Sequence, residues 1–431
     1  MEYFHYRDSA GQQELFAEDV ALSRIAERFG TPSYVYSSAA LVGRYRAFSE
    51  AVGDALVCYS AKANDNLAVL RCLGLEGAGV DIVSGGELAR ALAADIAPAK
   101  IVFAGVGKTG AEMAQALDAG IGQYNVESEQ ELELLATLAA DRGLRAPVAL
   151  RVNPDVDAKT HDKISTGRAK DKFGIEFNQA EALYARAAQM DGIAMRGLAI
   201  HIGSQLTALA PFEAAFVRLG ELCLRLRAGG HTVSHLDLGG GLGIPYAEDG
   251  PDAEDGQLNL ADYGALVQRT KRDLEAGITL EPGRWMAGPA GLLLTQVIRV
   301  KRNGNKQFVI VDMAMNDLLR PALYGAWHDI QPVTPRPGEA LPVDIVGPIC
   351  ESGDVIATDR ALPELCAGDL IVVRDAGAYG AVMSSSYNSR MPAAEVMVRD
   401  ADSALIRPRL DYDAMLARDV LPDWQTGPAK A

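Results

Sequence analysis

Several short segments of the chain carry side chains that could do chemistry together. Lys62 lies in the segment Tyr59–Asn64, directly after a mostly apolar run, and the glycine-rich segment Gly239–Gly243 follows another such run. Adjacent glycines allow backbone N–H groups to approach an anion without interference from a Cβ atom. A lysine beside an anion pocket can form a Schiff base with an aldehyde. Each feature also has a plainer explanation, because a glycine run can be a tight turn and a lysine can simply lie on the surface.

Two further segments, His201–Gln205 and Glu281–Arg284, also follow apolar runs. Pyridoxal phosphate carries both an aldehyde and a phosphate, so it matches a lysine that faces a phosphate pocket. Its ring nitrogen needs an acidic partner, and Glu281 is the candidate. His201 is available to cover the face of the ring, although a hydrogen-bonded core histidine is an equally good explanation for it.

The sequence does not match either of two nucleotide-binding motifs that its glycines suggest. The dinucleotide fingerprint that begins at Gly239 would need a glycine where the chain has Ile244, and Pro245 then interrupts the required helix. The P-loop pattern that would end at Lys108-Thr109 needs a glycine where the chain has Val102. We therefore expect Gly105–Thr109 to be a turn between a strand and a helix, with Thr109 as the N-cap of a capping box.

The four segments follow four of eight apolar runs, which alternate with helical patterns between residues 38 and 290. The runs are nearly continuous, as expected of strands buried on both faces. In one helical pattern, Gln130–Asp141, three leucines lie on one face. Eight such units over about 250 residues are typical of a (β/α)8 TIM-type barrel, whose catalytic residues follow the C-terminal ends of the strands. The predicted strands are Ala55–Ser60, Gly79–Val83, Lys100–Ala104, Ile121–Val126, Pro147–Val152, Arg196–Ile202, Ser234–Leu238 and Gly277–Leu280.

After residue 290 the pattern changes to strand-like segments separated by Gly/Pro turns. The fold class is therefore predicted as α/β plus all-β, with the barrel at residues 38–290. Residues 1–37 and 291–431 would form a second, antiparallel β domain. Its predicted strands are Gly291–Lys301, Lys306–Asp312, Leu341–Gly347 and Asp369–Asp375, and Ser33–Tyr36 would join them.

Composition excludes several classes of protein. The chain has 431 residues, and its 41 Lys and Arg against 57 Asp and Glu give a net charge of −16. An excess of acidic residues argues against binding to nucleic acid or to an anionic membrane surface. The apolar stretch Gly291–Val300 is too short to span a bilayer. The N-terminus shows no secretory signal, so we expect a cytoplasmic protein.

The five cysteines have wide spacings and form no CxxC motif. We therefore expect neither disulfides nor a metal site, and a reducing compartment. Apart from Cys350, they are expected to be small buried hydrophobic residues. The five are Cys58, Cys72, Cys223, Cys350 and Cys366.

Taken together in this order, the motifs resemble the diaminopimelate decarboxylase family of pyridoxal-phosphate enzymes, which are built on the alanine-racemase-like barrel. The resemblance runs from about Tyr34 to Asp419. It rests on Tyr59–Asn64, His201–Gln205, Gly239–Gly243, Glu281–Arg284, Met315–Tyr324, Cys350–Asp354 and Ala378–Gly380.

The resemblance implies roles for the matching residues. Lys62 would bind pyridoxal phosphate covalently, His201 would stack on its ring and Glu281 would contact the ring nitrogen. Cys350 would be the acid that protonates the product. Its loop would enter the active site of the partner subunit, so that the protein is a homodimer with shared active sites. The catalytic residues would thus be Lys62, Cys350 and His201. The implied cofactor-binding residues are Lys62, His201, Ser204, Gly239, Gly240, Gly241, Gly243, Glu281, Pro282, Gly283, Arg284 and Tyr379, and the implied substrate-binding residues are Arg284, Arg320, Tyr324, Glu351 and Tyr379.

The implied activity is that of a carboxy-lyase, which converts meso-2,6-diaminopimelate to L-lysine and CO2 in the last step of lysine biosynthesis. Two arginines suit the distal carboxylate of that substrate. The nearest alternative is a decarboxylase of ornithine, arginine or a carboxypolyamine. Ornithine and arginine lack the distal carboxylate, so Arg320 and Tyr324 argue against them. An amino-acid racemase and a non-catalytic homologue are further alternatives. The Cys350-Glu351 loop favours decarboxylation over racemization, and the presence of both Lys62 and Cys350 argues against a non-catalytic homologue.

Overall fold

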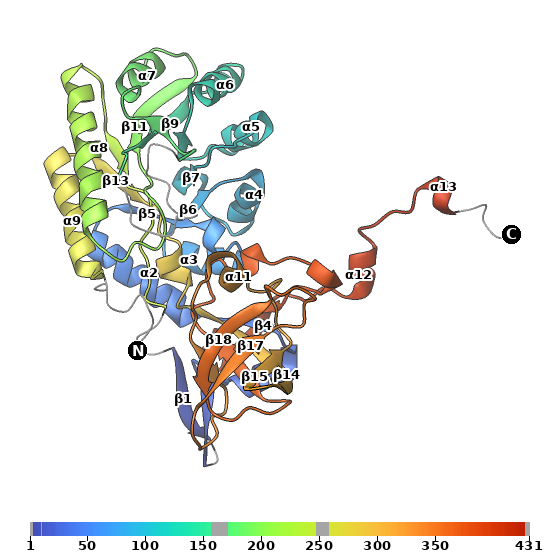
Figure 1. Ribbon diagram of the computed structural model, residues 1–431. Helices are drawn as coiled ribbons and strands as arrows, with labels where there is room; N and C mark the ends of the chain where they lie inside the picture. The colour runs from blue at the N-terminus through green and yellow to red at the C-terminus, as the bar shows by residue number, and fades with distance from the viewer. Residues whose placement is uncertain (1–2, 10, 157–170, 247–257, 427–431) are drawn as a thin grey trace.

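The computed structural model describes residues 3–9, 11–156, 171–246 and 258–426. Eight parallel strands close into a barrel, in which β13 pairs with β5 and β8 pairs with β9 (Figure 1). All eight predicted barrel strands are confirmed, with ends that differ by a few residues. The strands are β5 (Leu56–Ser60), β6 (Gly79–Ile82), β7 (Ile101–Phe103), β8 (Gln123–Val126), β9 (Ala146–Asn153), β11 (Ile193–Ala199), β12 (His235–Asp237) and β13 (Gly277–Leu280), and the short β10 (Ile175–Glu176) pairs with β9.

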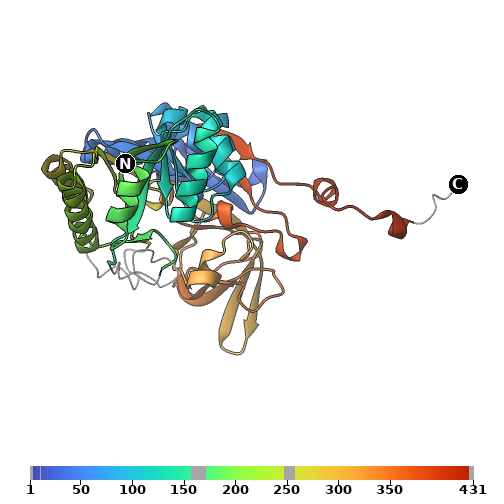
Figure 2. The same cartoon turned by 90° about the horizontal axis from the view of Figure 1, so that it is seen from above.

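Helices surround the barrel in an outer layer (Figure 1; Figure 2 shows it from above). Only a short helix, α10 (Arg284–Ala287), follows the last barrel strand, and α2 (Ser38–Val52), which precedes the first, packs against both α3 and α9. The N-terminal helix α2 therefore completes the ring. The others are α3 (Leu67–Leu75), α4 (Gly85–Ala93), α5 (Gly110–Ala119), α6 (Glu129–Ala140), α7 (Ala180–Ala187), α8 (Ala210–Ala228) and α9 (Leu260–Leu274).

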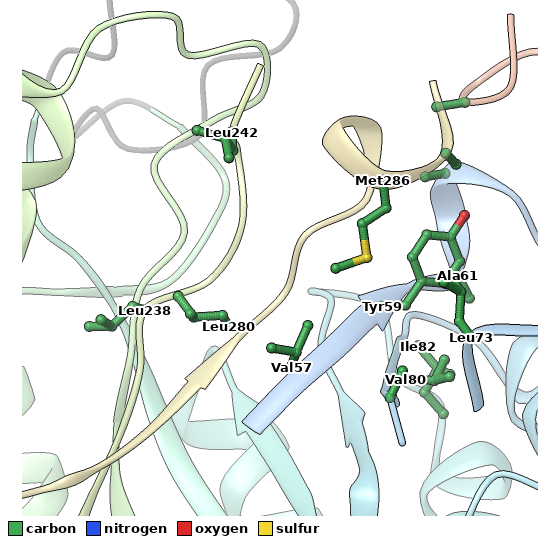
Figure 3. Close-up of a cluster of buried hydrophobic side chains, with 14 of the residues drawn as sticks. Val57, Tyr59, Ala61, Leu73, Val80, Ile82, Leu238, Leu242, Leu280 and Met286 are labelled. Carbon is green, nitrogen blue, oxygen red and sulfur yellow. The ribbon is translucent and has the colours of Figure 1, made fainter. Parts of the chain in front are cut away.

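Local sequence explains where several helices begin and which face they bury. The predicted capping box is present at α5, where Thr109 accepts from the N–H of Glu112 and the Glu112 carboxylate accepts from the N–H of Thr109. In α6, Leu132 and Leu135 are buried and Leu138 is partly buried against the core, so the predicted apolar face is present. Figure 3 shows part of the core, to which β5 contributes Val57 and Tyr59 and α10 contributes Met286.

The second sheet has nine strands and lies below the barrel in Figure 1. It is mostly antiparallel, as predicted, although β15–β17 and β4–β20 are parallel pairs. The predicted segment Ser33–Tyr36 does join this sheet, as β4 between β14 and β20. The strands are β4 (Ser33–Ser37), β14 (Gly291–Asn303), β15 (Lys306–Val311), β16 (Ile330–Pro332), β17 (Leu341–Val346), β18 (Val355–Leu362), β19 (Leu370–Val373), β20 (Ala394–Arg399) and β21 (Asp402–Arg407).

Smaller elements complete the chain. A three-stranded sheet of β1 (Phe4–Ser9), β2 (Gln12–Ala17) and β3 (Val20–Ala21) precedes α1 (Leu22–Phe29). The helix α11 (Arg320–Tyr324) lies between β15 and β16 in the chain. After β21, α12 (Tyr412–Leu416) and α13 (Asp423–Thr426) extend away from the body of the molecule (Figure 1).

The barrel mouth and the β sheet domain are joined by two hydrogen bonds next to Lys62. The N–H of Tyr379 donates to the carbonyl of Ala63 at 2.8 Å, and Asn64 Nδ2 donates to the carbonyl of Gly377 at 3.0 Å. These bonds hold a loop of the second domain against the turn that carries the lysine.

All five cysteines carry free thiols, and Cys58 and Cys223 are buried as expected. Cys72, in α3, is only partly buried. The expectation of burial was wrong for Cys366, which is exposed before β19 because its loop only joins two strands at the surface. Among the residues described, no helix combines the length and the apolar character that crossing a membrane requires.

One glycine in the barrel wall gives a direct test of this packing. Gly197 sits at a β-bulge in β11, and a Cβ atom there would lie 1.7 Å from the carbonyl oxygen of His235 on β12. Gly197→Ala should force the two strands apart and lower the free energy of unfolding by about 1–3 kcal/mol. Thermal unfolding measures the effect. The control is Gly107→Ala, where a Cβ atom would meet nothing within 4 Å, and equal stability of the two variants would contradict this packing.

Candidate active site

Lys62 lies in a one-turn helix that follows β5, and its ammonium group is paired with a buried carboxylate. Lys62 Nζ donates to Asp81 Oδ2 at 3.0 Å, and Ser60 Oγ donates to the same oxygen at 2.6 Å. Burial lowers the pKa of Lys62, but the charges of Asp81 and Glu281 outweigh burial, so the pKa is raised overall. Asp81 was missed in the sequence, although a charged residue inside the apolar run Gly79–Val83 was a usable signal.

Glu281 follows β13 and belongs to a buried pair of carboxyl groups. It is hydrogen-bonded to Asp237 at the end of β12, and Asn125 Nδ2 donates both to Asp237 Oδ2 at 2.9 Å and to Glu281 Oε1 at 3.1 Å. Burial, and then the negative charge of Asp237, raise the pKa of Glu281. Because two buried carboxylates this close cannot both be charged at low cost, the arrangement favours a proton on one of them. Asp237 is a second residue that the sequence analysis missed.

The glycine-rich segment lies between the loops that carry Glu281 and His201. A Cβ atom on Gly239, whose φ is +68°, would lie 2.3 Å from the carbonyl oxygen of Ile200, and one on Gly240 would lie 2.1 Å from that of Glu281. These two glycines are therefore required by the close packing of the barrel's own loops. The N–H of Gly239 donates to Asp237 Oδ1 at 3.0 Å.

His201 lies at the barrel mouth after β11. Its Nδ1 accepts from the N–H of Gly240 at 3.2 Å, so the ring proton is on Nε2. Burial, and then the positive charges of Lys62 and Arg151, lower the pKa of His201 well below its usual value. The ring is therefore neutral, as a flat group that stacks on an aromatic cofactor can be.

Arg284 begins α10 and is 6% exposed. Its Nη2 donates to Ser204 Oγ at 3.1 Å, and its Nη1 donates to the hydroxyl of Tyr246. The guanidinium carbon lies 4.5 Å from the centre of the Tyr379 ring. The structure thus brings together three of the predicted residues, Arg284, Ser204 and Tyr379, and adds Tyr246.

Arg320, the first residue of α11 in the second domain, also contacts Tyr246. Arg320 is 5% exposed, and its guanidinium carbon lies 4.3 Å from the centre of the Tyr246 ring. Its Nη1 donates to His328 Nε2 at 2.6 Å. Tyr324 interacts electrostatically with both Arg284 and Arg320.

Both of these arginines are buried, and neither forms an ion pair with a carboxylate of the part of the chain that the structure describes. Among the described residues, no ion pair involves Arg284 or Arg320, and the Nε atom of each is buried without a hydrogen-bond partner. Buried charges are normally paired, because leaving water costs each ion several kcal/mol. The two guanidinium groups therefore fit a site for anionic ligands, such as a phosphate and a carboxylate. Together with Lys62 and Glu281, they match the groups that pyridoxal phosphate requires.

Cys350 and Glu351 are not brought to this cluster. Both are exposed on the loop after β17, where the N–H of Cys350 donates to Asn388 Oδ1 at 2.9 Å and Glu351 Oε1 accepts from the N–H of Gly353 at 3.3 Å. Within the described part of the chain, no hydrogen bond or ion pair connects either side chain to Lys62 or Arg320. The cluster at the barrel mouth thus lacks them within one chain.

Comparison with known proteins identifies the barrel. Residues 38–288 match the family described as pyridoxal-dependent decarboxylase, pyridoxal binding domain. This span contains Lys62, His201, the glycine-rich segment and Glu281–Arg284. Arg320, Tyr324, Cys350 and Tyr379 lie outside it.

Relatives extend the match over nearly the whole chain. The diaminopimelate decarboxylase of Pseudomonas aeruginosa is 51% identical over 98% of this chain and 99% of its own length, and that of Vibrio cholerae is 48% identical over 98% and 100%. The crystal structure of diaminopimelate decarboxylase from Helicobacter pylori complexed with L-lysine is 38% identical and has a TM-score of 0.87. It covers 92% of this chain and 98% of that one.

The Lys62–Asp81 pair leads to a prediction about reactivity. Asp81→Asn removes the charge that raises the pKa of Lys62, while burial continues to lower it, so the amine should become nucleophilic at lower pH. We expect the rate at which borohydride fixes pyridoxal phosphate on Lys62, measured by peptide mass spectrometry at several pH values between about 7 and 10, to be higher in the variant at each pH.

The matched control is Asp95→Asn, because Asp95 pairs with Arg71 at the surface, where its side chain is 75% exposed. This control should reproduce the native profile. An identical profile for Asp81→Asn, or an adduct on another lysine, would contradict the assignment.

Proposed function

The chain belongs to the diaminopimelate decarboxylase family of pyridoxal-dependent decarboxylases, and on that premise we propose that it converts meso-2,6-diaminopimelate to L-lysine and CO2. The observation that carries the proposal is the pair of buried arginines, Arg284 and Arg320, without a carboxylate partner in the described chain. Diaminopimelate has an amino-carboxylate at each end. One end reacts, and the other needs a cationic site.

Pyridoxal phosphate, when bound, supplies the electron sink that stabilises negative charge on the carbon that loses CO2. Lys62 would hold it covalently, and Glu281 would hold the proton on its ring nitrogen. Burial and the negative charge of Asp237 raise the pKa of Glu281, which favours a proton at that place. Neutral His201 would cover the ring. We propose that the cofactor's phosphate and ring are held together by the residues around the glycine-rich segment, in which Gly239 and Gly240 shape the pocket through their close packing. These residues are Ser204, Gly239, Gly240, Gly241, Gly243, Pro282, Gly283, Arg284 and Tyr379.

Arg320 and Tyr324 would bind the distal carboxylate of the substrate, together with Arg284 and Tyr379. A guanidinium group with a free Nε edge can hold a carboxylate through two parallel hydrogen bonds. Glu351 would pair with the distal ammonium. Ornithine and arginine have no distal carboxylate, so Arg320 would remain buried without an ion-pair partner among the described residues when they bind. This cost favours diaminopimelate over both.

We propose that the site is completed by a second copy of the chain. Decarboxylation needs an acid to protonate the carbon that has lost CO2, and the Cys350 thiol is the family's candidate. Its position on an exposed loop, without a contact to Lys62 in the same chain, supports a homodimer in which each Cys350-Glu351 loop enters the partner's site. The division into a barrel at 38–290 and a domain at 1–37 and 291–431, which contributes substrate and dimer loops, is part of this proposal. The free thiols suit a cytoplasmic location.

The proposed substrate can be tested directly. The protein loaded with pyridoxal phosphate should release CO2 and L-lysine from meso-diaminopimelate and turn over ornithine and arginine far less well. Arg320→Ala should reduce kcat/KM for diaminopimelate by the equivalent of about 2–5 kcal/mol, because a buried charge loses its partner. Arg299→Ala, at an exposed position of β14, is the control. A native preference for ornithine or arginine would contradict the proposal that Arg320 binds a distal carboxylate.

Another prediction concerns the shared site. Lys62→Ala and Cys350→Ala homodimers should each be nearly inactive. After mixing and re-annealing, half of the dimers should be mixed, and each would have one site with both changes and one intact site, so activity should recover to roughly a quarter of the native level. Mass spectrometry of the intact dimers confirms the mixing. If heterodimers form and activity stays absent, Cys350 does not act across the dimer.

A further inference from the structure

His328 is a buried histidine that contacts Arg320 and has no role in the reaction proposed above. It is 2% exposed and lies between α11 and β16. Its Nε2 is 2.6 Å from Arg320 Nη1, and its Nδ1 is 2.8 Å from the carbonyl oxygen of Arg374. Its ring meets the Tyr246 ring at 72°, with 5.0 Å between the ring centres.

These two contacts fix the tautomer of His328. A carbonyl oxygen only accepts, so Nδ1 carries the proton, and a guanidinium only donates, so Nε2 offers its lone pair to Arg320. Burial, and then the positive charge of Arg320, lower the pKa of His328 to about 3. The histidine is therefore a neutral acceptor for a buried cation.

The arrangement leaves one edge of Arg320 available. Nη1 is held by His328 and the face of the guanidinium lies over Tyr246, whereas Nε is buried without a partner. A guanidinium held at one end and on one face has little freedom to rotate. Its Nε edge is consequently fixed in one direction before any ligand arrives, and preorganisation of this kind reduces the entropy lost on binding.

We propose that His328 is a positioning residue, which holds Arg320 so that its Nε edge receives the distal carboxylate of the substrate. This inference rests on the proposed function, because it concerns how that substrate is selected. His328 touches Arg320 and does not need to touch the substrate, so its effect should appear in the recognition of a carboxylate.

Two amide variants separate this role from a merely structural one. The terminal atoms of glutamine reach the position of the histidine Nε2, so His328→Gln keeps an acceptor for Arg320. Asparagine places its amide near the position of Nδ1, so His328→Asn keeps a donor for the Arg374 carbonyl and leaves Arg320 Nη1 without its acceptor. A role limited to packing would make the two variants similar.

The probes are L-lysine, which keeps the distal amino-carboxylate, and cadaverine, which has no carboxylate. Calorimetric titration of each holoprotein should show that His328→Asn reduces the affinity for L-lysine about 10- to 100-fold, the range expected for a hydrogen bond to a charged group. The affinity for cadaverine should change less than about twofold, since cadaverine has no carboxylate for Arg320 to hold. His328→Gln should bind L-lysine close to the native level. KM for diaminopimelate should rise in His328→Asn more than kcat falls.

Three results would overturn the inference. These are native-like L-lysine binding by His328→Asn, equal weakening of both ligands, or equal weakening of L-lysine by both variants. Circular dichroism during heating shows whether each variant is folded. If His328→Asn does not fold, His328→Gln alone decides: loss of L-lysine binding by the folded His328→Gln protein would count against the inference. The native protein is titrated alongside. If the native protein neither binds L-lysine nor decarboxylates diaminopimelate, the proposed function itself fails. If the native protein does both and the variants bind L-lysine equally well, only the role of His328 is rejected.

Discussion

Two buried guanidinium groups both contact Tyr246, and much of the site can be understood from how the protein stabilises their charges. Arg284 comes from the barrel and Arg320 from the β sheet domain, so the pair exists only where the two domains meet. Neutral groups stabilise the charges: Tyr246 and Ser204 accept hydrogen bonds from Arg284, and His328 accepts one from Arg320. An internal carboxylate would stabilise them further, but it would also occupy the place of a ligand.

The opposite charge lies deeper in the barrel. Asp81, Asp237 and Glu281 are all buried, and Lys62 is the cation that faces them. The site thus has an acidic floor around the lysine and a basic side at the domain junction. Such a separation suits a ligand with a protonated ring nitrogen at one end and anionic groups at the other, because each end meets a charge of opposite sign.

The barrel could be predicted from the sequence because strands buried on both faces leave nearly continuous apolar runs. In the second domain β18, β20 and β21 were missed, because polar or charged residues interrupt the apolar pattern of each: β18 and β21 are half exposed, and the buried strand β20 contains Glu395. In the site, motif positions gave Lys62, Glu281 and Arg284. Asp237 and His328 were missed because a single polar residue in the sequence does not reveal that its partners, Glu281 and Arg320, will lie beside it. The glycines were identified, but the reason expected for Gly239 and Gly240 differs from the packing contacts that the structure shows.

The most direct test of this account is a crystal structure of the protein with pyridoxal phosphate and L-lysine bound. The account predicts that the α-carboxylate of lysine accepts hydrogen bonds from the Nε edge of Arg320, while His328 keeps its contact with Nη1. It also predicts that the Cys350 loop of a second copy closes the same site. A lysine carboxylate held away from Arg320, or an acidic side chain of the protein paired with that arginine, would contradict it.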